Sequence, residues 1–211
     1  MRLIRALVTL YQTYHHRAPA ARLHILIRFL TCPFLRVLRF VPPDARSLLE
    51  VGAGHGVFSR LAGLPRVVAV EPDLRKMGPV EGVQLIVGYD ETVRGQFDVV
   101  AMMDVLYAIP MASWDALLSR LHERLAPGGT LLIKEQDPSS IKNRWNRAQE
   151  WISMRLLRIT MANAFDYESR EAFAARLTRL GFRDVSSKRV DFGYPHPHLL
   201  FIARKSGSTK G

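Results

Sequence analysis

Short apolar runs alternate with helically spaced segments between residues 45 and 205, and this alternation predicts an α/β fold. The apolar runs are predicted strands and lie at residues 47–51, 66–71, 83–87, 97–103, 130–135, 182–190 and 199–204. Helical spacing occurs at residues 57–61, at 111–125, from residue 141 onwards and at 167–180. Because the run at 97–103 is apolar at six of its seven positions, as in strands buried on both faces, we expect a mostly parallel sheet.

Residues 1–41 differ from the rest of the chain. Their apolar positions have helical spacing, and few of their positions are polar. In the first segment, polar residues recur at steps of three and four, which predicts an amphipathic helix that Pro19 interrupts. The next two segments, residues 20–30 and 33–40, are apolar nearly all round. We expect these helices to form a lid that packs on the open edge of the sheet and over a bound ligand.

Two membrane-related alternatives for residues 1–41 are disfavoured by their polar positions. A secretory signal would continue its apolar stretch through residues 11–17, where the chain has Tyr-Gln-Thr-Tyr-His-His-Arg instead. A transmembrane span needs about twenty nearly uncharged residues, whereas residues 23–41 hold three arginines and a proline. Binding flat on a membrane surface remains open.

The most informative stretch is residues 47–59, where an apolar run is followed by three glycines at every second position. Gly52, Gly54 and Gly56 lie between a predicted strand and a predicted helix. Because glycine lacks a Cβ atom, the turn can adopt positive φ and a ligand can approach the backbone, while the following helix starts with unpaired N–H groups. A dinucleotide fingerprint would need glycine at position 57, which is Val57, so a nicotinamide cofactor is disfavoured.

With Glu50, the three glycines form the pattern Glu-x-Gly-x-Gly-x-Gly. This pattern resembles motif I of the class I S-adenosylmethionine-dependent methyltransferases. The next predicted strand ends in Glu71, where this family commonly binds both ribose hydroxyls through a carboxylate. The resemblance covers roughly residues 45–138 and implies S-adenosylmethionine as the cofactor. Asp90 would meet the adenine amino group, although aspartate also favours turns. The implied cofactor-binding residues are Glu50, Gly52, Ala53, Gly54, Gly56, Glu71, Pro72, Asp90, Asp104 and Val105.

Residues 104–107 follow the fourth predicted strand and resemble motif IV of the same family, commonly Asp-Val-Leu-x-His. We expect them to border the site, because ligands lie beyond the carboxyl ends of parallel strands. Ala108 stands where histidine is frequent, so the candidate catalytic residues are Tyr107 and His55. The chain also lacks the Asn/Asp-Pro-Pro-aromatic sequence of amino-directed nucleic acid methyltransferases, which argues against a nucleobase amine as acceptor.

Polar side chains in apolar surroundings are further candidates. His24 and Arg28 are four residues apart and share a helix face among leucine, isoleucine and phenylalanine. Arg28 could clamp the methionine carboxylate of the cofactor or an anionic group of the acceptor, or it could form a structural ion pair with a core acid. The predicted acceptor-binding residues are Tyr14, His24, Arg28 and Tyr107. Charged residues at the end of the fifth strand either face the pocket or are solvated, namely Lys134, Glu135 and Asp137.

Composition adds two constraints. The 211-residue chain has one cysteine, Cys32, and therefore no internal disulfide, and no cysteine–histidine cluster suggests a metal site, so we expect a cytoplasmic protein. The net charge of +11 is uneven, because residues 1–46 hold eight arginines against Asp44, whereas residues 50–139 hold eight basic and twelve acidic side chains. Residues 140–211 are basic as well, with fourteen basic and six acidic side chains. Basic ends attract nucleic acid, an anionic membrane surface or a phosphorylated acceptor, or they reflect a preference for surface arginine.

The sequence therefore predicts a doubly wound, Rossmann-like α/β fold with a seven-stranded, mostly parallel sheet and an antiparallel C-terminal hairpin. We expect an N-terminal helical lid at residues 1–44, a methyltransferase domain at 45–205 and a disordered tail at 206–211. The expected function is S-adenosylmethionine-dependent O- or C-methylation of a small-molecule or lipid-like amphiphilic acceptor. Peripheral contact with the inner membrane surface is expected through residues 1–41. The alternatives are an RNA-directed methyltransferase, with nucleic acid the less expected partner, and a non-catalytic S-adenosylmethionine-binding protein.

Overall fold

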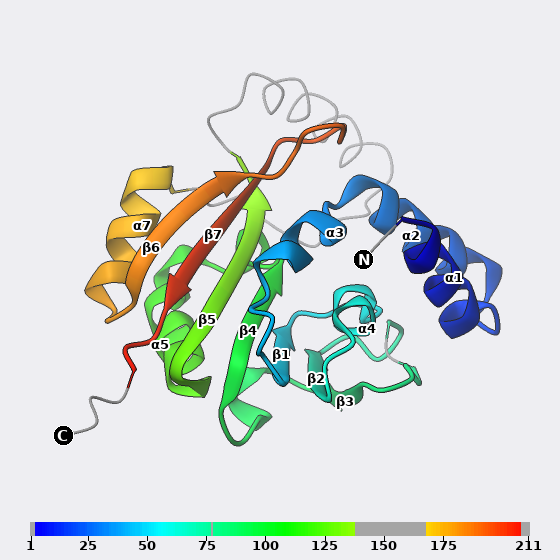
Figure 1. The fold of residues 1–211 in the computed structure, drawn as a ribbon, viewed down its shortest axis with the longest axis horizontal. Coiled ribbons are helices and arrows are strands. Elements are labelled where there is room, and N and C mark those ends of the chain that lie inside the picture. Colours follow the sequence, from blue (N-terminus) through cyan, green and yellow to red (C-terminus); the bar gives the residue numbers. More distant parts are fainter. Residues whose placement is uncertain (1–2, 77, 138–167, 208–211) are drawn as a thin grey trace.

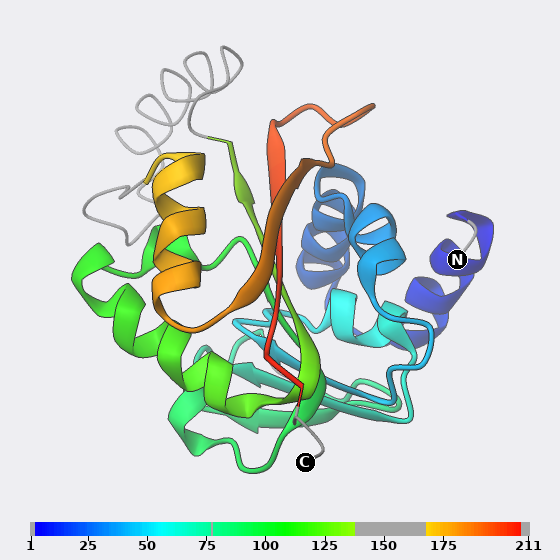
Figure 2. The same ribbon diagram turned by 60° about the vertical axis from the view of Figure 1, so that its left-hand side comes forward.

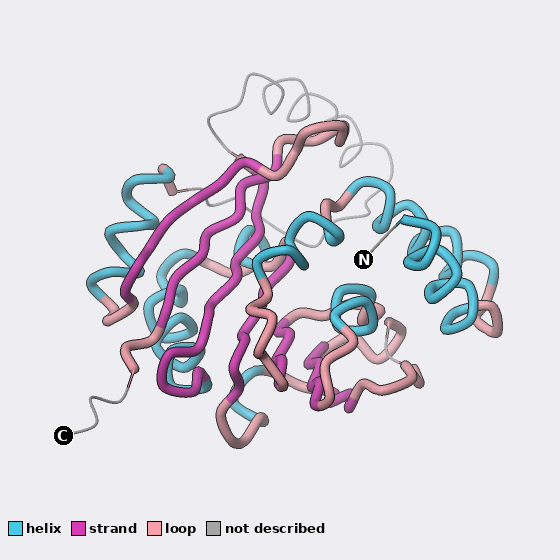
Figure 3. The backbone as a smooth tube through the Cα atoms, viewed as in Figure 1, coloured by secondary structure: helices cyan, strands magenta, loops and turns pink. Residues whose placement is uncertain are grey.

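The computed structural model describes residues 3–76, 78–137 and 168–207, and the strands of these residues form one seven-stranded sheet in the order β3-β2-β1-β4-β5-β7-β6 (Figures 1 and 3). The first five strands in this order are parallel, and β7 is antiparallel to both β5 and β6. The predicted α/β sheet with its closing hairpin is confirmed. The strands are β1 (Ser47–Val51), β2 (Arg66–Glu71), β3 (Gln84–Val87), β4 (Phe97–Met103), β5 (Leu125–Gln136), β6 (Arg183–Arg189) and β7 (His198–Arg204).

The strand order reverses at β1, which pairs with β2 on one side and with β4 on the other. Val51, the last residue of β1, is opposite Val70 in β2 and Met102 in β4, so the three strands end in nearly the same row. All five residues of β1 are buried, as expected for a central strand covered on both faces. In an open α/β sheet this reversal creates a crevice beyond the carboxyl ends of the strands.

Helices cover both faces of the sheet (Figure 2). On one face lie α5 (Trp114–Arg124) and α7 (Arg170–Arg179), whose apolar sides join one buried cluster with β4, β5 and β7. The hydroxyl of Ser169 accepts the Ala172 N–H at 3.1 Å and caps the start of α7. The predicted helix beginning at residue 141 falls outside the described residues, and helix α5 is preceded by a short 3₁₀ turn, Met111–Ser113.

The opposite face carries α4 (Val57–Ala62) and the N-terminal helices. The latter are α1 (Leu3–Tyr14), α2 (Pro19–Thr31) and α3 (Phe34–Val37), followed by the 3₁₀ turn η1 (Leu38–Phe40). Their buried side chains, including Leu10 and Phe29, join a second cluster with Phe58 of α4 and residues of the central strands. The lid therefore packs on a face of the sheet as well as over its carboxyl end. No helix among the described residues has the length and apolarity needed to cross a bilayer.

Candidate functional site

A cavity of about 210 Å³, here called the glycine-loop cavity, lies beyond the ends of β1, β2 and β4 and beside α2. Of the predicted cofactor-binding residues, its lining includes Glu50, Gly52, Ala53, Gly54, Glu71 and Asp104. It also includes both predicted catalytic residues, His55 and Tyr107, and two further predicted acceptor-binding residues, His24 and Arg28. Predicted site residues from the ends of strands, from the glycine loop and from helix α2 thus line one cavity. The predicted residues outside the lining are Tyr14, Gly56, Pro72, Asp90 and Val105.

Two glycines of the loop after β1 have different physical roles. Gly52 has a φ of +72°, and a Cβ atom there would lie 2.5 Å from Cγ2 of Val105, so no side chain fits between the glycine loop and Val105. Gly54 has a φ of +57°, and a Cβ atom there would meet nothing within 4 Å. Gly52 is therefore needed for packing, while Gly54 keeps open the space beside the cavity.

Glu71, the last residue of β2, ties the glycine loop to its own strand. Its carboxylate accepts the Gly54 N–H at 2.8 Å on one oxygen and the Asp73 N–H at 3.1 Å on the other. The residue is buried at 5 % exposure and lines the cavity. A carboxylate has about four lone-pair sites, so both oxygens can accept further hydrogen bonds from a ligand.

Glu50 contributes a second buried carboxyl group to the cavity. One of its oxygens accepts both the N–H and the hydroxyl of Ser59, at 2.9 and 2.6 Å. Burial raises the pKa of Glu50 to about 7, and the two hydrogen bonds from Ser59 only partly oppose this effect. Glu50 therefore changes its charge near neutral pH.

Asp104 is the centre of an ion cluster that joins the lid to the sheet. Its carboxylate lies 2.8 Å from a guanidinium nitrogen of Arg28, in α2, and also contacts the ammonium group of Lys134, in β5. Burial alone would raise the pKa of Asp104, but Lys134 and Arg28 outweigh it and hold the pKa below its usual range. The structural ion pair considered for Arg28 is thus present. Lys134 is completely buried, so its alternative of a solvated charge is wrong.

The rings of the two histidines of the cavity, His24 and His55, are in an edge arrangement, with centroids 5.3 Å apart and an interplanar angle of 64°. Nδ1 of His55 lies 3.1 Å from the carbonyl oxygen of Lys76, and since a carbonyl only accepts, we assign the proton to Nδ1 and leave Nε2 unprotonated. Burial, followed by the neighbouring His24, lowers the pKa of His55. The neutral ring is therefore able to take up a proton at Nε2.

Several predicted residues support the cavity from outside its lining. The hydroxyl of Tyr14 donates to the carbonyl oxygen of His55 at 2.9 Å, so Tyr14 braces the glycine loop. Val105 packs against Gly52, and Gly56 begins α4 with a φ of +73°. Asp90 is buried beside Arg120 of α5, whose Nε donates to it at 2.5 Å. Asp90 is thus paired with an arginine of α5, the helix on the face of the sheet opposite to the lid (Figure 2).

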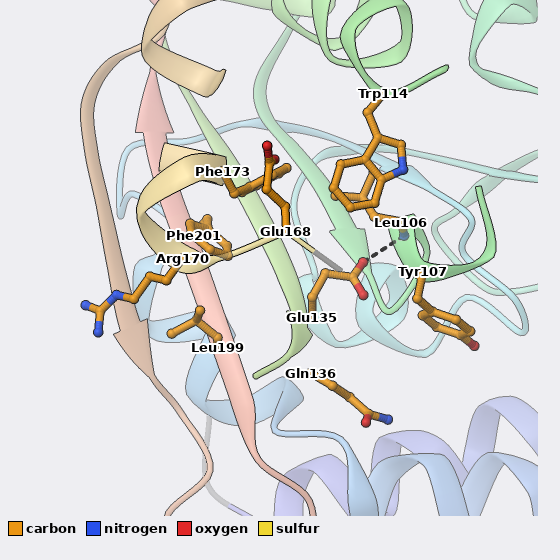
Figure 4. A pocket seen from close by; sticks show the side chains of 10 residues that line it. All are labelled: Leu106, Tyr107, Trp114, Glu135, Gln136, Glu168, Arg170, Phe173, Leu199 and Phe201. Atoms are coloured by element: carbon orange, nitrogen blue, oxygen red, sulfur yellow. Dashed lines mark hydrogen bonds between the residues drawn. The ribbon is translucent and has the colours of Figure 1, made fainter. Parts of the chain in front are cut away.

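A second, smaller cavity lies beside the first, on the α5 and α7 side of the sheet (Figure 4). We call it the aromatic cavity, because it is lined by Trp114, Phe173 and Phe201, together with Leu106, Tyr107, Glu135, Gln136, Glu168, Arg170 and Leu199. Tyr107 lines both cavities. The side chain of Tyr107 therefore forms part of the wall of both cavities.

Glu135 is the charged residue of the aromatic cavity whose position the sequence left open. One carboxylate oxygen accepts the N–H groups of Val105 and Leu106 at 2.9 and 2.8 Å and holds the loop after β4 (Figure 4). The other oxygen is buried without a hydrogen-bond partner among the described residues. Burial, followed by the charge of Asp104, raises the pKa of Glu135. A buried oxygen of this kind calls for a polar partner from a ligand, which is a donor where Glu135 is ionised and an acceptor where Glu135 is protonated.

The sheet order, the glycine loop after β1 and the carboxylate at the end of β2 together define a class I S-adenosylmethionine-dependent methyltransferase. A family model described as a methyltransferase domain matches residues 15–187. The chain belongs to this family, and the predicted enzyme class and cofactor, S-adenosylmethionine, are confirmed.

Solved structures with the same fold have low sequence identity to the chain. A SAM-dependent methyltransferase from Archaeoglobus fulgidus has a TM-score of 0.62 and 16 % identity, over 82 % of this chain and 92 % of that one. The 1,6-didemethyltoxoflavin-N1-methyltransferase of Burkholderia thailandensis has a TM-score of 0.63 and 17 % identity, over 90 % and 91 %. Human N-acetylserotonin methyltransferase has a TM-score of 0.65 and 16 % identity, over 98 % and 60 %. These similarities concern the fold.

One curated protein similar in sequence is a highly reducing polyketide synthase, stpks1, of Strobilurus tenacellus. It is 29 % identical over 151 residues, which cover 66 % of this chain and 5 % of the synthase. The chain thus corresponds to a small part of that protein.

Proposed function

We propose that the chain transfers the methyl group of S-adenosylmethionine to a small-molecule or lipid-like amphiphilic acceptor, by O- or C-methylation. The observation that carries this proposal is that Tyr107 lines both cavities. A cofactor in the glycine-loop cavity and an acceptor in the aromatic cavity would face each other across this side chain. The apolar part of the acceptor would pack against Trp114, Phe173 and Phe201.

The residues of the glycine-loop cavity fit the cofactor. Glu71 has acceptor capacity for two ribose hydroxyls, and the open space at Gly54 admits a ligand close to the backbone. Three carboxyl groups, Glu50, Glu71 and Asp104, line the cavity together with Arg28 and Lys76, and this mixture of charges suits a ligand that carries both a cationic sulfonium and an amino acid group. When bound, S-adenosylmethionine supplies an electrophilic methyl group on a sulfonium sulfur. The remaining predicted cofactor residues, including Pro72 and Asp90, stay predictions.

The chain's own part in the reaction is to orient the acceptor, exclude water and accept a proton. Helix α2 covers the glycine-loop cavity with His24, Ile25 and Arg28, which limits the access of water. Correct orientation alone contributes up to about 7–11 kcal/mol in favourable model reactions. A hydroxyl acceptor would transfer its proton to Nε2 of His55, or to Tyr107 where its phenol is ionised, and such general-base catalysis typically contributes about 10²–10⁴-fold.

The second oxygen of Glu135 supports an acceptor that carries a hydrogen-bond donor. Together with Oε1 of Gln136, it is one of two buried polar atoms without a described partner among the residues that line the aromatic cavity. A hydroxyl, enol or amino group attached to an apolar body would satisfy it. The sequence similarity to part of a polyketide synthase is consistent with a small-molecule acceptor.

The test is to incubate the purified chain with S-adenosylmethionine and separate panels of phenols, enolisable ketones, hydroxylated amphiphiles and RNA, and to measure S-adenosylhomocysteine by mass spectrometry. We expect product with at least one small or amphiphilic acceptor, and a lower rate for Tyr107→Ala. Product formation with RNA alone would refute the proposed acceptor class and support the RNA-directed alternative. A Gly52→Val variant, whose side chain would collide with Val105, is the inactive control.

A further inference from the structure

Helices α1 and α2 expose apolar side chains on their outward sides as well as burying them inward. Nine large hydrophobic residues of the two helices are exposed, with Tyr11 at 73 % and Leu23 at 59 %. In α2 the exposed residues recur at steps of three, one and three, which places them on a single face. This outward apolar face consists of Leu3, Ile4, Leu7, Val8 and Tyr11 of α1 and Leu23, Leu26, Ile27 and Leu30 of α2.

The outward apolar face is also hollowed. A groove runs between the two helices and is lined by Leu7, Tyr11, Leu23 and Leu26, among others, with Arg22 and His15 at its side. Leu10 and Ile25, from the buried sides of the same helices, form its floor. Apolar side chains exposed on two neighbouring helices cover more area than the scattered exposed residues usual on a protein surface.

The charged side chains of the two helices themselves are all basic. Residues 1–46 contain eight arginines and one acidic residue, Asp44. Arg5 and Arg22 are exposed on α1 and α2, and Arg39 is exposed in η1. A helix surface with an apolar face and flanking arginines is the combination that binds at the interface of an anionic bilayer.

We propose that the outward apolar face of α1 and α2 docks on an anionic lipid bilayer, with the exposed leucines and isoleucines entering the boundary between headgroups and acyl chains. The arginines of the lid contact the anionic headgroups. A cytoplasmic protein would meet such lipids at the inner membrane surface.

A second copy of the chain fits this face less well. In a symmetric dimer the same surface meets itself, so the excess of arginines would lie opposite an equal excess. Lipid headgroups of negative charge remove this repulsion. RNA would use the arginines, but it leaves the leucines and isoleucines without a partner.

Docking on this face places the membrane next to the proposed acceptor site. The opposite side of α2 carries His24, Ile25 and Arg28, which line the glycine-loop cavity. An amphiphilic acceptor could thus reach the site from the bilayer past a single helix. This consequence rests on the proposed function, whereas the docking itself does not.

The experiment is co-sedimentation of the full chain with vesicles of phosphatidylcholine, with or without phosphatidylglycerol. Two variants, Leu23→Glu and Ile27→Glu, place a charge on exposed positions of α2, which are 59 % and 50 % exposed. The matched control is Leu74→Glu, because Leu74 is 69 % exposed and lies outside the two helices. Calorimetric titration with S-adenosylhomocysteine verifies that each variant keeps its fold.

We expect the wild type and Leu74→Glu to bind the anionic vesicles equally, with affinity that falls as salt increases. Each α2 variant should bind roughly tenfold or more weakly, since it replaces a membrane-inserted apolar side chain by a repelled carboxylate. Failure of the wild type to sediment with anionic vesicles, or equal binding by the α2 variants, would refute the proposal. So would conversion of a dimer to a monomer by these variants without loss of vesicle binding. None of these outcomes depends on methyl transfer, so the proposed function is judged separately.

Discussion

The sheet beneath the glycine loop and the N-terminal lid use apolar residues in opposite ways. Strand β1 is buried at all its positions, and the carboxyl groups beside it are held by backbone N–H groups or by a neighbouring hydroxyl. The lid buries one side of α1 and α2 and exposes large apolar residues on the other, amid arginines. The first arrangement suits a small, polar, cationic ligand, and the second suits an extended apolar surface with negative charge.

The two regions are joined by one buried ion cluster. Arg28 of the lid and Lys134 of the sheet share the carboxylate of Asp104, which itself lines the glycine-loop cavity. Asp104 has a positive φ of 59°, uncommon for a residue other than glycine. The position of the lid is thus coupled to the conformation of the loop after β4.

The largest effect is expected from Lys134→Met. The substitution removes a fully buried ammonium group and leaves the carboxylate of Asp104 with Arg28 alone. Breaking one partner of a buried ion pair typically costs about 3–5 kcal/mol, so urea unfolding should show a loss of this size. Lys188→Met, at an exposed position of β6, is the control; it removes only a cation–π contact with Phe40 and should lower stability by about 1 kcal/mol at most. Equal stability of the two variants would show that the cluster does not hold the core and lid together.

The next largest expected effect is a change of folding stability with pH. It arises from the buried acids of the core and not from the exposed charges of the lid. The pKa of Glu50 is raised to about 7 from 4.5, so between these pH values the folded chain binds a proton that the unfolded chain has released. The contribution of Glu50 to stability is therefore largest below about pH 4.5 and decreases by about 3 kcal/mol as the pH rises to 7. Glu135, whose pKa is also raised, acts in the same direction.

Glu50→Gln should remove the contribution of Glu50 while keeping an oxygen for Ser59. We expect urea unfolding at pH 5 and pH 7.5 to show a smaller difference for this variant than for the wild type. The exposed Glu81, whose side chain is 79 % exposed, provides the control variant Glu81→Gln, with an unchanged difference. A variant at Glu50 that retains the full pH dependence would contradict the assignment.

Cofactor affinity tests the glycine loop directly. Glu71→Ala removes the acceptor of the Gly54 N–H and the proposed acceptor of the ribose hydroxyls. Hydrogen bonds to charged groups contribute about 1.5–3 kcal/mol each, so calorimetry should show roughly 100-fold weaker binding of S-adenosylmethionine. Glu81→Ala should bind as tightly as the wild type, and an unchanged affinity for Glu71→Ala would place the ribose elsewhere.

The difference between the sheet and the lid also shows which features could be predicted from the sequence. The glycine loop and the acid at the end of β2 depend on contacts between strands adjacent in the sheet, and their roles follow from a local pattern of residue types. The partnership of Arg28, Asp104 and Lys134 joins residues that are 76 and 30 positions apart, and no local pattern indicates such a partner. Asp90 shows the same limit, because Arg120 is brought to it by the packing of α5.

The two sides of α2 could not be predicted from the sequence either, since a helix that is apolar nearly all round gives no local signal of which side is buried. The segment that forms α1 has an amphipathic pattern, but apolar positions such as Ile4 and Tyr11 are nevertheless exposed. Position 25 is 3 % exposed and position 27 is 50 % exposed, although both are isoleucines of α2. The two positions differ only through the packing of α2, which turns Ile25 toward the glycine-loop cavity and leaves Ile27 exposed.

The smallest expected effect uses this pair of isoleucines. Ile25→Val removes a buried methyl group and should lower the free energy of unfolding by about 1 kcal/mol, whereas Ile27→Val, on the outward apolar face, should leave it unchanged within about 0.5 kcal/mol. Urea unfolding in the absence of lipid measures both, with each variant serving as the control for the other. An equal loss at position 27 would mean that the outward side of α2 is already covered in the free chain, which removes the basis for docking on a bilayer. A loss confined to position 25 leaves the outward face available, so that a membrane effect of Ile27→Glu could then be attributed to the surface itself.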